Sequence, residues 1–407
     1  MSREMKDSGI EWLGKIPKEW KIKKGKSLYN ITTGKLDANA EEPDGAYPFF
    51  TCSKFPKKIN CYAFDCEALL VAGNGLVGFT QYYKGKFNAY QRTYVLNDFE
   101  DTCPQFLKYY VSNNLKREVE QNSVGSVIQF IKLGDLQNFN VAFPKYEEQE
   151  KIANYLEENC LHLDSVIEKT KASILEYQKL KQSIITRAVT NGIVPRRLMK
   201  ESGVDWIGEI PIEWSIEKGK NLFKETNERS KTGAEELLTV SHITGVTPRK
   251  EKNVNMFMAE SLVDYKICYK GDIAANTMWM WQGAIGVSKY SGVVSPSYNT
   301  YRQKYDTYDA DYLEYLLRIP PLIVTYAAYS TGITASRLRL YPQGFFSIFF
   351  PIPPKKEQHE IVMYLNRKIP QIDQLILKKE KFVNELESYK KSLIYEYVTG
   401  KKEVPES

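Results

Sequence analysis

The chain has few of the residues on which many enzymes and metal proteins depend. Among its 407 residues there are only three histidines and six cysteines. No serine or cysteine near any of the histidines supports a nucleophilic triad. No two cysteines form a CxxC pair, so we expect neither structural zinc nor a secreted disulfide framework, and a reduced, cytosolic setting is favoured. The cysteines are Cys52, Cys61, Cys66, Cys103, Cys160 and Cys268.

Long hydrophobic runs and a strong excess of one charge are also missing. No apolar stretch approaches the roughly 20 residues of a membrane span, so we expect a cytoplasmic protein with no membrane partner. Lysine and arginine outnumber aspartate and glutamate by only 56 to 50, a net charge of +6 that does not by itself indicate a polyanion partner. The chain is long enough for two sizeable cores.

Three motifs that suggest catalysis are incomplete. Gly73–Gly78 spells GxGxxG, but β-prone residues follow it where a dinucleotide site needs a helix. Gly25–Ser27 resembles the end of a phosphate-binding loop, but Trp20 stands where its first glycine belongs. His359 begins an HExxH-like string in which Met363 replaces the second histidine. We also find no amino-methylation box and no nuclease pattern, so we predict a non-catalytic chain without its own cofactor or metal.

What the chain does contain is a tandem duplication. Ser8–Trp20 reads SGIEWLGKIPKEW, and Ser202–Trp214, which begins 194 residues later, reads SGVDWIGEIPIEW. A second string, Glu148-Gln149, returns at Glu357-Gln358, an offset of 209 residues. The two offsets differ, so the segment between the repeated strings is longer in the second copy. A duplicated frame that holds two dissimilar inserts suggests that each insert recognises a different target.

After each Glu-Gln string, apolar residues recur at alternating spacings of three and four, which is the pattern of a coiled coil. We predict long helices at Asp164 to Thr190 and Asp373 to Thr399 that pack antiparallel to each other. Pro370 is expected to kink or restart the second helix. The residues that we expect to hold the helices together are Leu163, Ile167, Ile174, Tyr177, Ile184, Ile372, Ile376, Val383, Leu386 and Leu393.

The segments between the head strings and the helices have short β-prone runs punctuated by turns, together with short helical patterns. Each is therefore predicted to be a mixed α/β (α+β) domain. We expect strands at 68–72, 78–83 and 87–90, with a hairpin turn at 84–86, and at 271–275, 283–288 and 293–296, with a turn at 290–292. Short helices are expected at 105–119 and 310–317.

Basic residues interleaved with aromatics and amides on these loops and strand ends indicate a nucleic-acid surface. Lysine suits phosphate, arginine suits guanine, and asparagine or glutamine suits adenine. Tyrosine and tryptophan in strands are more often core, so each position is only a candidate. The candidates are Lys54, Lys57, Gln81, Tyr83, Lys84, Lys86, Arg92, Gln129, Lys132, Lys250, Asn276, Trp279, Trp281, Gln282, Lys289, Asn299, Arg302, Ser336, Arg337 and Arg339.

Both head strings, both Glu-Gln helices ending in Val-Thr, and Trp281–Gly286 with Val294–Pro296 resemble the specificity subunit of Type I restriction-modification systems. The resemblance covers nearly the whole chain. It implies two target recognition domains at 1–146 and 199–353, followed by helical spacers at 147–198 and 354–407. It implies that each domain reads half of a split double-stranded DNA site. The recognition segments vary within the family, so no base-contacting residue is transferred.

The resemblance further implies two methyltransferase subunits that carry S-adenosylmethionine and, through them, restriction subunits that use ATP and Mg²⁺. A helix of about 27 residues is about 40 Å long, close to the roughly 34 to 36 Å of one DNA turn, so the helices are expected to set the spacer. Two other interpretations stay open. One is a freestanding DNA-modifying enzyme, and the other is a coiled-coil adaptor without nucleic-acid contact.

Overall fold

A computed structural model describes residues 3–121, 130–251, 261–334 and 337–405. The chain divides into two compact units, which we call unit 1 (Met1–Lys171 with Glu380–Ser407) and unit 2 (Ala172–Lys379). Each has its own hydrophobic core of helices and strands, which confirms the predicted mixed fold class. No helix in the described part of the chain is both long and apolar enough to cross a membrane.

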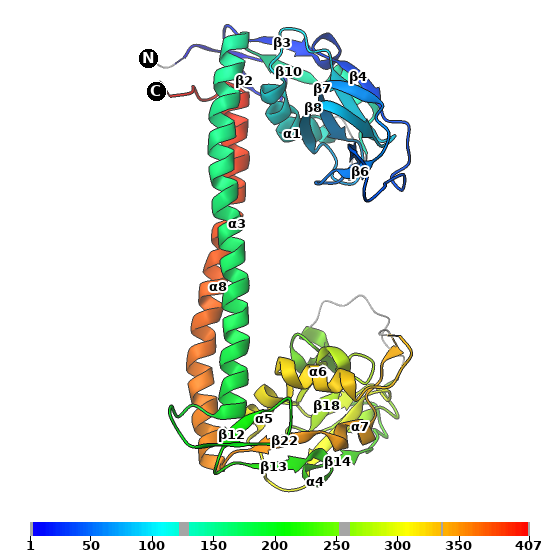
Figure 1. The fold of residues 1–407 in the computed structure, drawn as a ribbon, viewed down its shortest axis with the longest axis vertical. Coiled ribbons are helices and arrows are strands. Elements are labelled where there is room, and N and C mark those ends of the chain that lie inside the picture. Colours follow the sequence, from blue (N-terminus) through cyan, green and yellow to red (C-terminus); the bar gives the residue numbers. More distant parts are fainter. Residues whose placement is uncertain (1–2, 122–129, 252–260, 335–336, 406–407) are drawn as a thin grey trace. The chain divides into compact units, whose positions relative to one another are not determined.

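Two long helices contribute to both units. They are α3 (Tyr146–Asn191) and α8 (Lys355–Val398), and both can be followed in Figure 1. Each helix begins 18 residues before the predicted start. The segment after each Glu-Gln string continues the same apolar spacing, and its apolar side chains are buried in the unit cores. Ile152 and Leu156 pack into the unit 1 core, and Ile361 and Leu365 into that of unit 2.

The predicted restart at Pro370 is wrong, because α8 continues through this residue without interruption. Proline removes only the bond that its own backbone nitrogen would have donated to the carbonyl of Asn366. Both residues are exposed, so water can hydrogen-bond to the free carbonyl and reduce the cost of the lost bond.

Within each unit the two helices run antiparallel, because the partner's number on α8 falls as the number on α3 rises. In unit 1 the pairs are Asp164 with Lys390 (2.6 Å) and Lys171 with Glu387 (2.7 Å). In unit 2 the ammonium of Lys379 lies 5.6 Å from the Tyr177 ring centre, and Lys181 pairs with Asp373 at 2.6 Å.

Every predicted seam residue is at least half-buried, which is what coiled-coil packing requires. Leu163, Ile167, Ile174, Ile372, Val383 and Leu393 are buried, and Tyr177, Ile184, Ile376 and Leu386 are half-buried.

Unit 1 is built on a six-stranded sheet in the order β4-β9-β7-β8-β5-β6, against which helix α1 (Pro104–Gln121) packs (Figure 1). Residues 84–86 lie inside β8 and are not the predicted hairpin turn. Gly85 has a φ of +128°, which glycine tolerates, and it still pairs with Cys66 on β7. The actual turn is Gly73–Phe79. The strands are β4 (Asn30–Thr33), β5 (Tyr47–Phe50), β6 (Lys57–Ile59), β7 (Phe64–Ala72), β8 (Thr80–Ala89) and β9 (Thr93–Asn97).

Unit 2 contains a four-stranded sheet in the order β14-β21-β18-β19, which matches the β4-β9-β7-β8 part of unit 1 strand for strand. We call this common arrangement the shared frame. The additions differ, because unit 2 has the separate pairs β15-β16 and β17-β20 in place of β5 and β6. The strands are β14 (Phe223–Thr226), β15 (Leu238–Ser241), β16 (Gly245–Pro248), β17 (Lys266–Cys268), β18 (Ile273–Ala275), β19 (Ile285–Val287), β20 (Gly292–Val294) and β21 (Asn299–Gln303).

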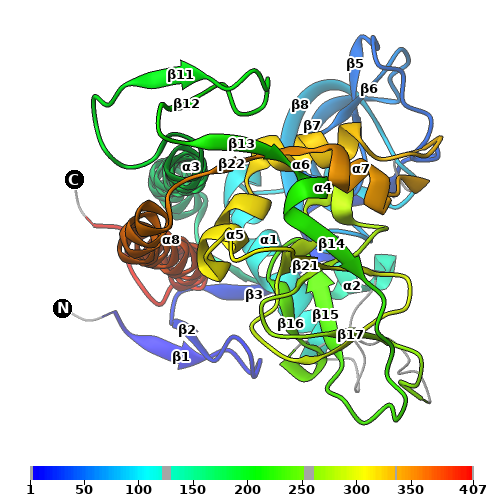
Figure 2. The ribbon, with the colours of Figure 1, turned by 90° about the horizontal axis from the view of Figure 1, so that it is seen from below.

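The remaining elements also correspond between the units. Unit 1 has β1 (Met5–Asp7), β2 (Lys15–Pro17), β3 (Lys21–Lys24), η1 (Gly25–Ser27), α2 (Leu133–Asn138) and β10 (Asn140–Phe143). Unit 2 has β11 (Met199–Glu201), β12 (Glu209–Pro211), β13 (Ser215–Lys218), α4 (Gly219–Leu222), α7 (Pro342–Ser347) and β22 (Phe349–Ile352). Unit 2 further has η2 (Arg249–Glu251), η3 (Met280–Gln282), α5 (Ala310–Leu317) and α6 (Pro320–Ala328). Figure 2 shows the β11-β12 hairpin beside the end of α3.

The glutamate of each Glu-Gln string fastens the head string to the start of the long helix. In unit 1, Glu148 accepts a hydrogen bond from the Trp20 indole at 3.0 Å and pairs with Arg3 at 2.7 Å. In unit 2, Glu357 accepts one from Trp214 at 2.8 Å and pairs with Arg197. Both repeated strings therefore have a structural role in this fold.

The glutamine of each string is fully buried. Gln149 holds the loop that precedes α1, and Gln358 holds the loop that precedes α5. The Gln149 side chain accepts from the Cys103 backbone nitrogen at 2.8 Å and donates to the carbonyls of Asp101 and Pro144. Gln358 repeats this arrangement. It accepts from the Asp309 nitrogen at 2.7 Å and donates to the carbonyls of Thr307 at 3.0 Å and Pro353 at 2.9 Å.

Candidate nucleic-acid interface

In unit 1 four segments meet around the turn between β7 and β8. The Gly73 nitrogen donates to the Arg92 carbonyl at 3.0 Å, and the Gly73 carbonyl accepts from the Ile131 nitrogen at 2.7 Å. The Cys52 thiol donates to the Arg92 carbonyl at 3.3 Å, and the Gln81 amide donates to the Ser53 carbonyl. We call residues 52–55, 73–78, 90–92 and 130–132 the unit 1 loop cluster.

The unit 1 loop cluster exposes apolar side chains next to cations. Phe55 and Phe130 are 74% and 54% exposed. The ammonium of Lys54 lies 5.6 Å from the Phe55 ring centre, and that of Lys132 lies 6.0 Å from the Phe130 ring centre. Arg92 is also exposed here. Exposed rings can stack on bases or touch thymine methyl groups while the cations meet phosphates, so the cluster suits nucleic acid.

The glycine motif Gly73–Gly78 forms the turn of this cluster. It joins two antiparallel strands, and no helix begins after it. Gly75 and Gly78 have φ values of +62° and +78°, which explains why the turn uses glycine. A dinucleotide site would need a helix amino terminus for the pyrophosphate, and this turn is followed by strand β8 instead.

The other unit 1 candidates lie elsewhere or have other partners. Lys57 on β6 pairs with Glu41 at 2.6 Å. The Tyr83 ring packs 5.3 Å from that of Phe50 in a small apolar cluster, so it serves the core. Lys84 and Lys86 are exposed on the opposite face of β8 from Tyr83, since side chains alternate along a strand. The structure thus gathers Lys54, Gln81, Arg92 and Lys132, and Gln129 lies outside the described residues.

In unit 2 the connection at the same place in the shared frame is Asn276–Gly283, which we call the aromatic loop. The Asn276 amide donates to the Tyr298 hydroxyl at 2.9 Å, and the Thr277 hydroxyl donates to the Ser297 carbonyl at 2.7 Å. Gly283 ends the short helix η3 with a φ of +86°. These bonds hold the aromatic loop in place. They are needed because the flanking strands β18 and β19 are much shorter than β7 and β8 of unit 1.

The aromatic loop carries two tryptophan rings that stack on each other, of which Trp279 is exposed and Trp281 is half-buried. Their centres are 6.3 Å apart with an interplanar angle of 20°, and Trp279 is 49% exposed. The Trp281 indole donates to the Met278 carbonyl at 3.1 Å, which fixes its ring. Burial raises the pKa of the nearby Tyr298 hydroxyl, so it stays protonated as a neutral partner of Asn276. The loop offers flat apolar surface where the unit 1 loop cluster offers phenylalanines and lysines.

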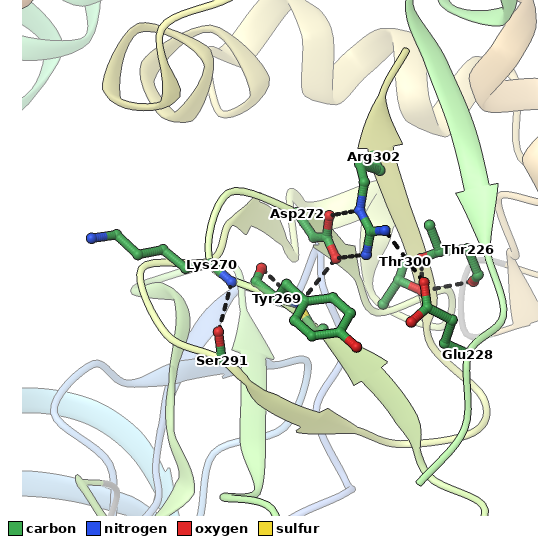
Figure 3. Close-up of polar contacts among 9 residues, drawn as sticks. Thr226, Glu228, Tyr269, Lys270, Asp272, Ser291, Thr300 and Arg302 are labelled. Carbon is green, nitrogen blue, oxygen red and sulfur yellow. Dashed lines mark hydrogen bonds and ion pairs between the residues drawn. The ribbon is translucent and has the colours of Figure 1, made fainter. Parts of the chain in front are cut away.

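Arg302 was a candidate for guanine recognition, but its guanidinium is held inside unit 2 (Figure 3). It donates to both oxygens of the buried Asp272 carboxylate, at 2.7 and 2.8 Å, and pairs with Glu228 at 3.3 Å. The Tyr269 ring centre lies 5.0 Å away. Hydrogen bonding to Asp272 raises the pKa of Arg302. With its donors committed to a carboxylate, this arginine stabilises the sheet in this structure rather than facing a base.

The remaining unit 2 candidates are dispersed. Lys250 pairs with Glu236 at 2.6 Å, and Lys289 with Asp311 at 3.3 Å. Asn276 and Asn299 are buried, and Gln282 is half-buried within η3. Arg337 is exposed and Arg339 half-buried in the turn closed by the Thr331–Arg339 bridge, and Ser336 lies outside the described residues.

The sequence prediction included Trp279 and Trp281 but missed four other apolar members of these surfaces. They are Phe55, Leu76, Phe130 and Met278, all exposed. The available signal was an apolar residue inside a turn-rich segment, where burial is not expected. In the described part of the chain, no three histidine, cysteine, aspartate or glutamate side chains are grouped to hold a metal.

Comparison with known proteins shows what the chain is similar to. Residues 17–176, which include the unit 1 loop cluster, match the model of the Type I restriction modification DNA specificity domain. The chain is 36% identical over 214 residues to the Type I restriction enzyme EcoDI specificity subunit of Escherichia coli, covering 52% of this chain and 43% of that protein. Part of this chain, residues 17–176, is therefore similar to the DNA specificity domain of Type I systems.

Two further curated proteins are similar at lower identity. The MjaVIII specificity subunit of Methanocaldococcus jannaschii is 24% identical over 221 residues, 51% of this chain and 50% of that protein. The chain thus spans about half the length of these first two curated relatives. From the same organism, the putative MjaX specificity subunit is 24% identical over 337 residues, 78% of this chain and 69% of that protein.

Two solved structures share the fold. A chain from a structure on complex assembly and conformational transition of the type I R-M system aligns with a TM-score of 0.70 at 14% identity, covering 94% of this chain and 98% of that one. The HsdS subunit of Thermoanaerobacter tengcongensis aligns with a TM-score of 0.51 at 13% identity, covering 97% and 100%. These likenesses concern the fold alone, and they agree with two domains and two long helices.

Proposed function

We propose that this chain is the DNA specificity subunit of a Type I restriction-modification complex, and that each unit reads one half of a bipartite site. The observation that carries the proposal is the shared frame with its two different surfaces. The same β-connection holds phenylalanines and lysines in unit 1 and stacked tryptophans in unit 2. A constant frame with variable loops is the arrangement that lets one fold recognise different sequences.

The two surfaces have different tasks in this proposal. In unit 1, Lys54, Arg92 and Lys132 contact phosphates while Phe55 and Phe130 reach base edges. In unit 2, the rings of the aromatic loop pack against bases and thymine methyl groups. The long helices connect the two readers and set the length of the unread spacer. Because the surfaces differ, the two half-sites differ as well.

The chain performs no covalent step and holds no cofactor in this proposal. Methylation and cleavage belong to partner subunits, which bring S-adenosylmethionine, ATP and Mg²⁺. Support comes from the names of the three curated relatives described above, each of which is named as a specificity subunit. Assembly with two methyltransferase subunits and, through them, restriction subunits is part of the same proposal.

The long helices carry apolar side chains on their outer faces that could receive the methyltransferase subunits. On α3, Leu161 and Leu175 are exposed, and on α8 the same holds for Met363, Leu377 and Phe382. A helix in a two-stranded coiled coil normally presents polar residues to solvent, so an additional apolar stripe indicates a further helix partner.

The phosphate contacts are tested by the salt dependence of DNA binding. Replacing Lys54 and Lys132 together with glutamine, in the chain purified with its methyltransferase subunits, should lower the slope of log K against log salt by about 0.9 per lost contact. Binding to duplexes of any sequence should weaken similarly, because phosphates carry no base identity.

The matched control is Lys57→Gln, since Lys57 is already paired with Glu41. Its salt slope should equal that of the wild type. Equal slopes for the wild type and the double variant would contradict the assignment of unit 1, and absence of any salt-dependent duplex binding would contradict the proposed function.

A further inference from the structure

Unit 2 contains a cavity at the end of α3 that the proposed DNA contacts do not use. Its volume is about 650 Å³, and its walls come from the last turns of α3, the segment 192–197 and one side chain of α8. Ala188 and Tyr364 line its apolar side. Arg187 and Arg196 line it too, and both are exposed.

The same place in unit 1 has different contents. Tyr364 corresponds to Tyr155, but Ala188 corresponds to Tyr397, at the repeat offset of the helices. The Tyr397 ring lies 4.6 Å from that of Tyr155, and their hydroxyls are 3.2 Å apart. An aromatic side chain therefore fills in unit 1 the space that alanine leaves open in unit 2.

The hairpin beside the cavity also has different side chains in the two units. In unit 2, Leu198 and Ile212 stand at the open end of the β11-β12 hairpin and are 76% and 50% exposed. The Ile212 nitrogen donates to the Leu198 carbonyl at 3.2 Å. The equivalent residues of unit 1 are Glu4 and Lys18, which form an ion pair at 2.7 Å on the same backbone arrangement. A polar edge in unit 1 is thus an exposed apolar edge in unit 2.

The charges at the cavity also differ between the two units. Among the described residues neither Arg187 nor Arg196 forms an ion pair, whereas Arg197 is held by Glu213 and Glu357. The unit 1 counterpart of Arg187 is Glu396, which pairs with Lys402 at 2.8 Å. Unit 1 therefore neutralises its own charges at this place, and unit 2 leaves two cations free beside an apolar edge.

We propose that the cavity and the adjoining apolar edge form a docking site for a protein segment that presents an acidic side chain flanked by large apolar ones. The acidic group pairs with Arg187 and Arg196 at the cavity, and the apolar side chains cover Leu198 and Ile212. Because unit 1 fills and neutralises the equivalent place, each chain binds one such segment, on unit 2 alone.

A protein segment fits these observations better than nucleic acid does. Exposed leucine and isoleucine contribute nothing to phosphate binding, while an apolar patch rimmed by charge is typical of protein interfaces. Complementary charge adds specificity to such a contact, because a basic partner would meet two uncompensated arginines.

The experiment selects peptides on the full chain. A phage library of random 12-residue peptides is panned on the wild type after depletion on a variant that copies unit 1, Ala188→Tyr with Leu198→Glu and Ile212→Lys. A second variant, Arg187→Glu with Arg196→Glu, changes only exposed side chains and keeps the cavity. Thermal unfolding checks both variants, and fluorescence anisotropy measures dissociation constants for the selected peptides. DNA affinity and sedimentation are measured on the same samples.

The proposal expects enriched peptides that combine aspartate or glutamate with leucine, isoleucine or phenylalanine. They should bind both variants at least about tenfold more weakly than the wild type, since charge and apolar area are both removed from the contact. No peptide specific for the wild type, no acidic excess, or equal binding to either folded variant would overturn it. A tenfold loss of DNA affinity in the arginine variant would make the site a nucleic-acid surface, and a wild-type dimer that the unit 1 copy abolishes would make the occupant a second chain. Both results overturn the proposal.

Discussion

Replacing Gln358 with leucine should lower the free energy of unfolding of unit 2 by at least about 3 kcal/mol. Leucine is close to glutamine in size, so the change removes bonds rather than volume. The Asp309 nitrogen and the carbonyls of Thr307 and Pro353 would lose their partner at a fully buried position. Each buried polar group left unpaired costs about 1 to 3 kcal/mol.

The loss should spread beyond these three groups, because Asp309 also caps α5. Its carboxylate accepts from the backbone nitrogens of Asp311 and Tyr312. Hydrogen exchange of the full chain in urea should show early opening of α5 in unit 2, while the core of unit 1 keeps its protection.

The duplication offers two controls for this prediction. Gln149→Leu should destabilise unit 1 by a similar amount, because Gln149 makes the equivalent bonds. Gln178→Leu, at an exposed position of α3, should change stability by less than about 0.5 kcal/mol. A Gln358 variant as stable as the Gln178 variant would show that the buried amide does not hold the loop.

Replacing Trp279 and Trp281 together with alanine should weaken binding to the specific DNA site by about 10- to 100-fold. Contacts of this kind are worth about 1 to 3 kcal/mol per recognised base. The expected loss corresponds to one such contact, because the two rings stack on each other and Trp281 is half-buried. Non-specific binding should change far less, because the change removes no charge. Competition titration at fixed salt, with specific and unrelated duplexes, separates the two quantities.

The control is Tyr305→Ala, another exposed aromatic residue of unit 2 outside the aromatic loop. It should leave the ratio of specific to non-specific affinity unchanged. Thermal unfolding must show that the double tryptophan variant keeps its fold. If the folded double variant keeps the wild-type ratio of specific to non-specific affinity, the aromatic loop does not contact the recognised bases.

Much of the frame was predictable because its signals are local or repeated. The alternation of three and four apolar spacings predicted both long helices, and the duplicated strings predicted a repeated architecture with two mixed domains. The same spacing extends back to each Glu-Gln string, but the helix starts were still missed. The early turns pack into the unit cores through Ile152 and Ile361. Residues 84–86 look like a turn, but strand pairing on β7 outweighs the local preference of Gly85.

The candidate surfaces were harder to predict because partners lie far apart in the sequence. Arg302 and Asp272 are 30 residues apart, so nothing near Arg302 indicates that its donors are already committed. The unit 1 loop cluster combines four separate segments, and only their hydrogen bonds bring Lys54 near Arg92 and Lys132. Composition can therefore suggest a nucleic-acid surface, while the choice among its residues depends on the tertiary structure.

The central claim is that two different loops on one repeated frame read two separate half-sites. It is tested by selecting bound duplexes from a random library with the chain and its methyltransferase subunits. The wild type should retrieve two runs of fixed bases with an unread interval between them. Phe55→Ala with Phe130→Ala should relax one run, and Trp279→Ala with Trp281→Ala only the other. A single continuous run, or the same run relaxed by both variants, would contradict the account.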